Sequence, residues 1–202
     1  MPYAKSAISS KQIIDSAIRV LARQGYAKTS LLDIAKEAGM SKGALHYHYP
    51  TKEALIHSVL ETACNAVQTR TMEAWSPSDN PFGALRTSLE ELWATRARRT
   101  DEALVVADLL AQSLYSESLR PKLAEFYELA AAQIREYLED NLISLGLQPQ
   151  IPIEMLPRVV IGLLDGLVMQ AFVEPDALAP DDVVDAIQTI AISIFTPGGA
   201  KP

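Results

Sequence analysis

Apolar residues recur at helical spacing along the chain. The first such stripe has intervals of three and four residues, the period of one helix face. Its members are Ile13, Ile14, Ala17, Ile18, Leu21 and Ala22. We expect this helix to begin at about Ser10 and to end before Gly25, because glycine is a frequent C-terminal stop.

Capping residues predict two short helices after the first. Ser30 stands three residues before Asp33, the spacing of a capping box, and this helix should run through Ala38 and end at Gly39. Ser41 can cap a third helix over residues 42–49, which must stop before Pro50. The packing of this pair is constrained, since the small Ala35, the turn residue Gly39 and the aliphatic Leu45 follow at intervals of four and six. This arrangement is typical of a helix-turn-helix, and a helical hairpin with no DNA role is the alternative.

The remainder of the chain is also predicted to be helical. Thr51 can cap a fourth helix running toward Trp75, and the turn residues of 76–81 form the clearest linker. Later helices are expected at 82–98, 101–116, 118–145, 153–174 and 181–195. We predict an all-α fold of about nine helices with no strand. A helix-turn-helix domain would occupy 7–67, with its motif at 30–49, and a larger helical bundle would occupy 68–200.

Composition narrows the class of protein. The single Cys64 cannot close an intrachain disulfide or build a thiolate metal site alone, which fits a reducing compartment. Charged residues in the first turns leave no apolar stretch for a secretory signal, and the longest charge-free run, 186–200, is too short for a membrane span. We therefore expect a cytoplasmic protein without a membrane segment.

No enzyme or cofactor chemistry is predicted. His46 and His48 are two apart on a helix, so they point to nearly opposite sides and cannot chelate one ion. Cys64 has only His57 nearby on its helix, with no third orienting group. Paired Glu-x-x-His motifs of di-metal bundles are lacking in the sequence. We expect no metal, no cofactor and no catalytic residue.

Charge is divided unequally along the chain. The net charge is −7, yet residues 1–55 carry eight basic and four acidic side chains, a balance of +4 that leaves −11 for the rest. Such asymmetry indicates a polyanion-binding end joined to a different module. The start of the third helix fits this interpretation, since Lys42 is followed by the minimal side chains of Gly43 and Ala44, which let backbone approach base edges.

The run from Thr29 to Leu55, TSLLDIAKEAGMSKGALHYHYPTKEAL, resembles the DNA-binding signature of the TetR-type (TetR/AcrR) transcriptional regulators. The resemblance implies a recognition unit made by the second and third helices, linked by the fourth helix to a domain that dimerises and encloses a small ligand. Carried over by motif position, the DNA-binding residues are Thr29, Ser30, Ser41, Lys42, Gly43, Ala44, His46, Tyr47, His48 and Lys52. The family usually has tyrosine at His46, phenylalanine at Tyr49 and often a basic residue at Leu32.

Two further sets of residues are predicted in the acidic part of the chain. The eighth and ninth helices are apolar over broad faces, and an intermolecular four-helix bundle would cover them, as the resemblance also implies. The expected dimer residues are Val160, Leu164, Leu167, Ile187, Ile190 and Ile194. The candidate ligand-pocket residues are Trp93, Leu110, Tyr115, Phe126, Tyr127, Gln133 and Met169.

These observations predict a homodimeric repressor that leaves a palindromic DNA operator when a small-molecule effector binds. The alternative is a structural or division-control protein bound to DNA through the same fold and lacking an inducer. In either case we expect the protein in the cytoplasm, and on the nucleoid when it is bound to DNA. Ordinary helix capping by Ser30 and Ser41, and ordinary core packing by each pocket candidate, remain open from sequence alone.

Overall fold

The computed structural model describes residues 2–73 and 81–197, which form two compact units. The first unit joins the chain up to Val67 with residues 99–124, and the second joins residues 68–98 with the chain from Glu125 onward. Most of the expected linker, residues 76–80, lies outside the described residues. Residues 99–124 belong to the first unit because the helix they contain packs on the first helix of the chain. The functional boundary at residue 67 stays a prediction.

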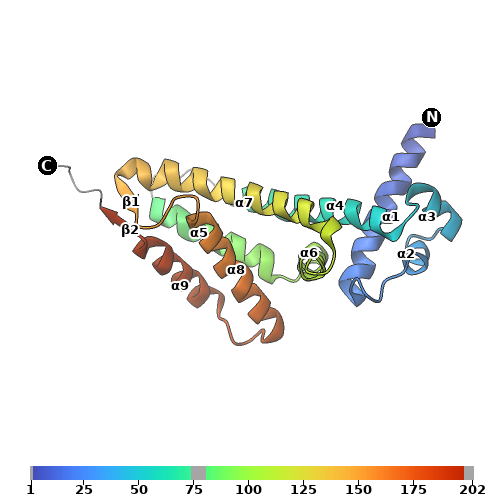
Figure 1. The fold of residues 1–202 in the computed structure, drawn as a ribbon. Coiled ribbons are helices and arrows are strands. Elements are labelled where there is room, and N and C mark those ends of the chain that lie inside the picture. Colours follow the sequence, from blue (N-terminus) through green and yellow to red (C-terminus); the bar gives the residue numbers. More distant parts are fainter. Residues whose placement is uncertain (1, 74–80, 198–202) are drawn as a thin grey trace. The chain divides into compact units, whose positions relative to one another are not determined.

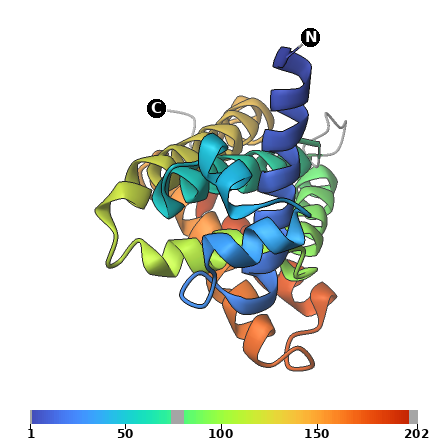
Figure 2. The same cartoon turned by 90° about the vertical axis from the view of Figure 1, so that its right-hand side faces the viewer.

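The first unit contains the three N-terminal helices, α1 (Pro2–Gln24), α2 (Leu31–Glu37) and α3 (Lys42–His48). It also includes most of α4 (Lys52–Glu73), as well as α6 (Asp101–Gln112), the 3₁₀ turn η1 (Glu117–Leu119) and the start of α7 (Arg120–Asn141). Helices α2 and α3, in lighter blue, lie beside α1 in Figures 1 and 2. Helix α1 begins well before Ser10, because a helix can extend beyond the turns that carry its apolar stripe.

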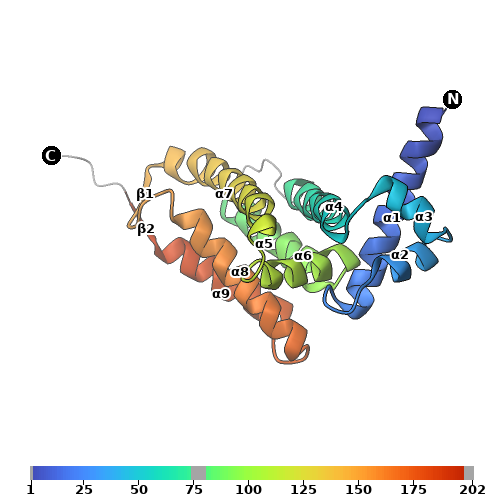
Figure 3. The same ribbon diagram turned by 45° about the vertical axis from the view of Figure 1, so that its right-hand side comes forward.

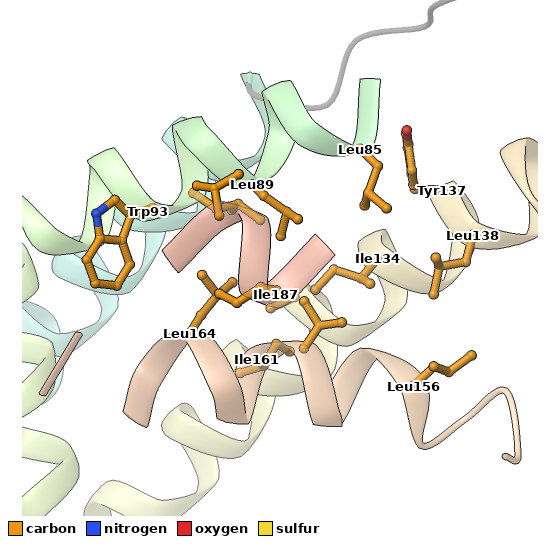
Figure 4. Close-up of a cluster of buried hydrophobic side chains, with 14 of the residues drawn as sticks. Leu85, Leu89, Trp93, Ile134, Tyr137, Leu138, Leu156, Ile161, Leu164 and Ile187 are labelled. Carbon is orange, nitrogen blue, oxygen red and sulfur yellow. The ribbon is translucent and has the colours of Figure 1, made fainter. Parts of the chain in front are cut away.

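The second unit is built on α5 (Pro81–Ala97), the rest of α7, α8 (Leu156–Val173) and α9 (Pro180–Ser193). Helices α8 and α9 run side by side in Figures 1 and 3, and both pack on α5. Figure 4 shows the apolar core between these helices, with Leu89 and Trp93 from α5, Ile134 from α7, Leu164 from α8 and Ile187 from α9.

The expectation that the chain has no strand is wrong. Strands β1 (Leu147–Pro149) and β2 (Phe195–Pro197) pair antiparallel in the second unit. Three residues are too few for an alternating apolar pattern, so the sequence carried no signal for them. The segment expected as one helix over 118–145 is likewise divided into η1, α7 and the 3₁₀ turn η2 (Ile143–Leu145), while α6 stops at Gln112 rather than at 116.

Helix α8 is long and apolar enough to cross a membrane by length and composition, with a mean hydropathy of 1.6. This helix is not among the runs of the sequence without charged residues, because it contains Arg158 and Asp165. Within the second unit, its Ile161 and Leu164 side chains are buried in the core. A helix can be this apolar because it crosses a membrane or because neighbouring helices cover it on several sides.

Candidate nucleic-acid interface

Helix α2 begins with the capping box that its sequence predicted. The Ser30 hydroxyl accepts a hydrogen bond from the Asp33 backbone N–H at 3.2 Å, and the Asp33 carboxylate accepts from the Ser30 N–H at 3.0 Å. The Ser30 hydroxyl also donates to the same carboxylate, and these bonds lower the pKa of Asp33. Ser30 thus caps the helix from an exposed position.

The turn between α2 and α3 follows the helix-turn-helix pattern. Gly39 has φ +65°, a left-handed conformation that disfavours residues with a Cβ. Ala35 and Leu45 are both buried, so the two helices meet through a small side chain and one aliphatic plug. The predicted packing roles of these three residues are confirmed.

Helix α1 contacts both α2 and α3 through polar side chains. Gln12 donates to the Ala38 carbonyl oxygen at 2.8 Å, at the end of α2, and the hydroxyls of Ser10 and Tyr49 are 2.9 Å apart, at the end of α3. These two hydrogen bonds tie the C-terminal ends of α2 and α3 to α1.

Two arginines of α1 also secure α2 through Glu37. Arg19 Nε and Arg23 Nη2 lie 3.1 Å and 3.3 Å from the two carboxylate oxygens of Glu37. Hydrogen bonds from Arg19 and then from Arg23 lower the pKa of Glu37. These two arginines are therefore engaged within the unit.

The outer face of α3 is exposed where the sequence predicted contact with bases and phosphates. Ser41 caps the helix by accepting from the Ala44 N–H at 3.1 Å, and Lys42, Gly43 and Ala44 are exposed in its first turn. Tyr47 is 85% exposed. A cation, small side chains and an exposed aromatic donor thus share a short helix that can enter a groove.

The two histidines of α3 differ in their surroundings. His46 is exposed, whereas His48 is partly buried and meets the Tyr47 ring edge to face, with centroids 5.6 Å apart. In the part of the chain that the structure describes, no three His, Cys, Asp or Glu side chains gather as a metal-binding group.

Thr29 is a correction to the predicted DNA-binding set. Its side chain is 4% exposed, and its hydroxyl donates to the Gly25 carbonyl oxygen at 2.7 Å. The threonine therefore closes the loop between α1 and α2, and its hydroxyl does not face a ligand. The motif position alone could not distinguish this role from the exposed one of its neighbour Ser30.

Lys52 is also more enclosed than expected. Its ammonium donates to the Tyr26 carbonyl oxygen at 2.8 Å and lies 4.0 Å from the centroid of the Tyr26 ring. Burial lowers the pKa of Lys52, while nearby Glu53 and Asp108 act in the opposite direction. The side chain anchors the loop between α1 and α2, and any phosphate contact would come in addition to this role.

Sequence reasoning missed Asp108 on α6. Its carboxylate accepts a hydrogen bond from the Tyr26 backbone N–H at 2.6 Å. The two residues are far apart along the chain, and no local pattern links them. Helix α6 thus helps to hold the loop that precedes α2 within the first unit.

The predicted pocket residues are divided between the two units. Leu110 and Tyr115 belong to the first unit, and Tyr115 is 89% exposed. Met169 is 51% exposed on α8, because its position on the helix faces away from the core. Four of the seven lie in the second unit with at least partial burial: Trp93, Phe126, Tyr127 and Gln133.

A groove of about 430 Å³ lies between α5 and α9 of the second unit. Trp93 is the predicted pocket residue that lines it. The other lining residues are Glu90, Ala94, Ala97, Arg98, Pro180, Asp181 and Val184. This volume falls within the range of small-molecule sites.

Three predicted dimer residues are buried within the chain itself. Val160, Leu164 and Ile187 are at most 6% exposed and belong to the core of the second unit, so they are unavailable to a partner. The prediction was wrong for them because helical periodicity marks an apolar face without saying what covers it. Leu167 and Ile194 are partly buried, and Ile190 is 42% exposed.

Two family models match the chain. Residues 13–59 match "Bacterial regulatory proteins, tetR family", and residues 81–195 match "BetI-type transcriptional repressor, C-terminal". Together with the helix-turn-helix geometry, these matches define a bacterial transcriptional regulator. The chain belongs to the TetR family.

Individual relatives agree with this assignment. The chain is 33% identical to the regulator YuxN of Bacillus subtilis over 126 residues, which cover 62% of this chain and 40% of YuxN. It is 32% identical to the regulator LmrA of the same bacterium over 136 residues, covering 66% of this chain and 72% of LmrA. The nucleoid occlusion factor SlmA of Marinobacter nauticus is 26% identical over 140 residues, covering 69% of this chain and 71% of SlmA.

The fold is shared with solved structures. FadR of Bacillus subtilis, crystallised with stearoyl-CoA, superposes with a TM-score of 0.75 at 20% identity, and the match covers 91% of this chain and 97% of FadR. At this identity the comparison shows the fold alone.

Proposed function

We propose that the protein is a homodimeric repressor whose α3 helices read a palindromic operator, and that a small molecule bound by the second unit releases the DNA. The exposed first turn of α3 carries the proposal, with Lys42, Gly43 and Ala44 directed to solvent from a helix held by α1. In a twofold dimer, the two helices would enter successive major grooves about 34–36 Å apart, or a multiple of that distance.

The proposed contacts with DNA would have different tasks. Lys42 and Ala44 would meet base edges and influence sequence preference, whereas Ser30, Ser41, Tyr47 and His48 would contact the backbone of the duplex. His46 is exposed and would reach less far than the tyrosine that the family usually carries.

Exposed apolar side chains of the last two long helices support dimerisation. Met169 and Val173 on α8 are 51% and 78% exposed, and Ile190 on α9 is 42% exposed. Large exposed apolar side chains on paired helices are candidates for burial against a second copy. The partly buried Leu167 and Ile194 would border this interface.

The groove beside Trp93 and the fold of FadR, crystallised with stearoyl-CoA, support an effector site in the second unit. Effector binding must favour a dimer geometry that differs from the DNA-bound one, since a ligand without differential affinity shifts no equilibrium. We place the protein in the cytoplasm, on the nucleoid when bound to DNA, and assign it no catalytic activity.

A second candidate function is that of a DNA-bound structural or division-control protein without an effector, which the match to the nucleoid occlusion factor SlmA favours. Genome-wide mapping of bound DNA, followed by band-shift titration of one bound site with metabolite fractions, separates the two. A promoter-proximal palindrome released by one fraction supports the repressor. Dispersed sites that no fraction releases support the second candidate.

A further inference from the structure

Two polar side chains lie at the edge of the apolar core of the second unit, Arg96 on α5 and Tyr127 on α7. On α5, Leu85, Leu89 and Leu92 are buried at helical spacing, and the next position in this register is Arg96. On α7, the buried positions Ala131, Ile134 and Leu138 are preceded in the same register by Tyr127. Arg96 is therefore a cation at a buried core position of α5.

These two side chains meet Asp165 of α8. Arg96 Nε lies 3.5 Å from Asp165 Oδ1, and the Tyr127 hydroxyl donates to Asp165 Oδ2 at 3.0 Å. Arg96 is 8% exposed, and its Nη1 atom is buried without a hydrogen-bond partner. The Asp165 side chain is 33% exposed.

The charges of this cluster are incompletely compensated. Burial lowers the pKa of Arg96 and raises the pKa of Asp165, and their mutual attraction opposes both shifts only in part. A guanidinium has five N–H donors, and a buried donor left without an acceptor is costly. Replacing a buried ion pair with apolar residues is often neutral or stabilising, so stability alone does not account for an arginine at this position.

We propose that Arg96, with Tyr127 and Asp165, recognises the carboxylate of an amphiphilic effector bound by the second unit. The proposal rests on the effector-binding role of the second unit given above. Arg96 Nη1 and the Tyr127 hydroxyl offer two donors, which suits the two oxygens of a carboxylate. Asp165 would turn toward solvent as the ligand carboxylate takes its place beside the guanidinium.

Other ligand head groups fit this cluster less well. One guanidinium offsets one negative charge, so a doubly charged phosphate ester would be only partly compensated by Arg96. A quaternary ammonium would meet Arg96 with the same sign of charge. A neutral hydroxyl could accept from Nη1, but it would not replace Asp165 as the counter-ion of the arginine. The distinguishing property is therefore a preference for the carboxylate over an alcohol with the same chain.

Isothermal titration calorimetry on the full-length protein tests this preference. The probes are a series of straight-chain carboxylates of increasing length, kept below their micellar concentrations. Each is compared with the alcohol, the alkyl phosphate and the alkyltrimethylammonium of the same length. We expect at least one carboxylate to bind roughly tenfold or more tightly than its three partners, since a hydrogen bond to a charged group contributes at this level.

Three variants assign the preference to the cluster. Arg96→Met should abolish the advantage of the carboxylate and leave alcohol binding unchanged, with circular dichroism checking that the variant is folded. Asp165→Asn removes the competing carboxylate and should tighten binding of the same probe several-fold. Arg135→Met, at an exposed arginine of α7, is the matched control and should behave as the unaltered protein.

Equal affinities for carboxylate and alcohol, no binding by any carboxylate, or a preference that survives Arg96→Met would each overturn the proposal. If the Arg96→Met variant fails to fold, the Asp165→Asn variant alone decides. A weaker affinity of this variant for the carboxylate probe would overturn the proposal. DNA binding without any probe, measured by band shift on the DNA upstream of the gene, tests the proposed function separately. Loss of head-group selectivity with intact DNA binding refutes only this inference.

Discussion

The Lys52 ammonium donates to the Tyr26 carbonyl oxygen at 2.8 Å and lies over the ring of the same tyrosine at 4.0 Å. On the other side of this residue, the Tyr26 N–H donates to Asp108. The loop that leads into the helix-turn-helix is thus held by α4 and α6 together. Within the first unit, the contacts that support α2 and α3 therefore extend beyond α1 to α4 and α6.

Removing the Lys52 charge should loosen this loop. We expect Lys52→Met to lower the free energy of unfolding by about 1 kcal/mol, since it loses a partly exposed cation–π contact and a hydrogen bond. DNA affinity should fall for every sequence. Urea unfolding measures the first effect, with Lys28→Met at an exposed lysine near the same loop as control. Equal stability of the two variants would contradict the anchoring role.

Tyr47 should affect DNA binding without affecting folding. Because its side chain is 85% exposed, Tyr47→Ala should change stability by less than about 0.5 kcal/mol. Its affinity for specific and unrelated duplexes should fall together, as expected for a backbone contact. Fluorescence anisotropy provides the measurement, and Tyr115→Ala, at a comparably exposed tyrosine outside α3, is the control. An unchanged affinity would remove Tyr47 from the interface.

Lys42 should influence which sequence is preferred. Lys42→Ala is expected to relax discrimination at one base pair of each half-site by about 1–3 kcal/mol, if its ammonium reads a base edge. Affinities for a set of single-base operator variants measure this directly. Lys36→Ala, at an exposed lysine of α2, is the matched control. A uniform loss across all variants would instead identify Lys42 as a phosphate contact.

Acid should weaken the attachment of α2 to α1 through Glu37. Its pKa is lowered in the folded protein from the ordinary 4.5, so its stabilisation is complete above that value. This contribution is lost as the pH falls through the lowered folded-state pKa. The free energy gap between the native protein and Glu37→Gln should therefore be larger at about pH 6 than at about pH 3. Denaturant unfolding at both pH values measures it, and a gap that widens in acid would contradict the pairing with Arg19 and Arg23.

A charge on the proposed dimer face should separate the subunits. Val173 is 78% exposed on α8, and Val173→Glu would bury a carboxylate in the interface. Analytical ultracentrifugation of the Val173→Glu variant should show monomers. Band-shift titration should show that its affinity for the operator is lower. Leu129→Glu, at a 45% exposed apolar position of α7, should remain a dimer. A dimeric Val173→Glu protein would place the interface elsewhere.

Much of the motif could be predicted because its signals are local. The caps at Ser30 and Ser41, the turn at Gly39 and the plug at Leu45 depend on neighbours within a few residues, and each is found as expected. Thr29 shows the limit of such reasoning, since its neighbour Ser30 is exposed while its own hydroxyl faces the loop.

The sequence by itself determined the helical architecture, the order of the long helices and the capped starts of α2 and α3, because periodicity and capping act over a few residues. Tertiary structure alone decided which apolar faces are covered within the chain and which remain free, so Leu164 and Ile187 lie in the core while Met169 and Val173 are exposed. It also brought Arg96 to Asp165 and Tyr26 to Asp108, pairs far apart in sequence. Such contacts depend on how helices pack, and no local pattern encodes that packing.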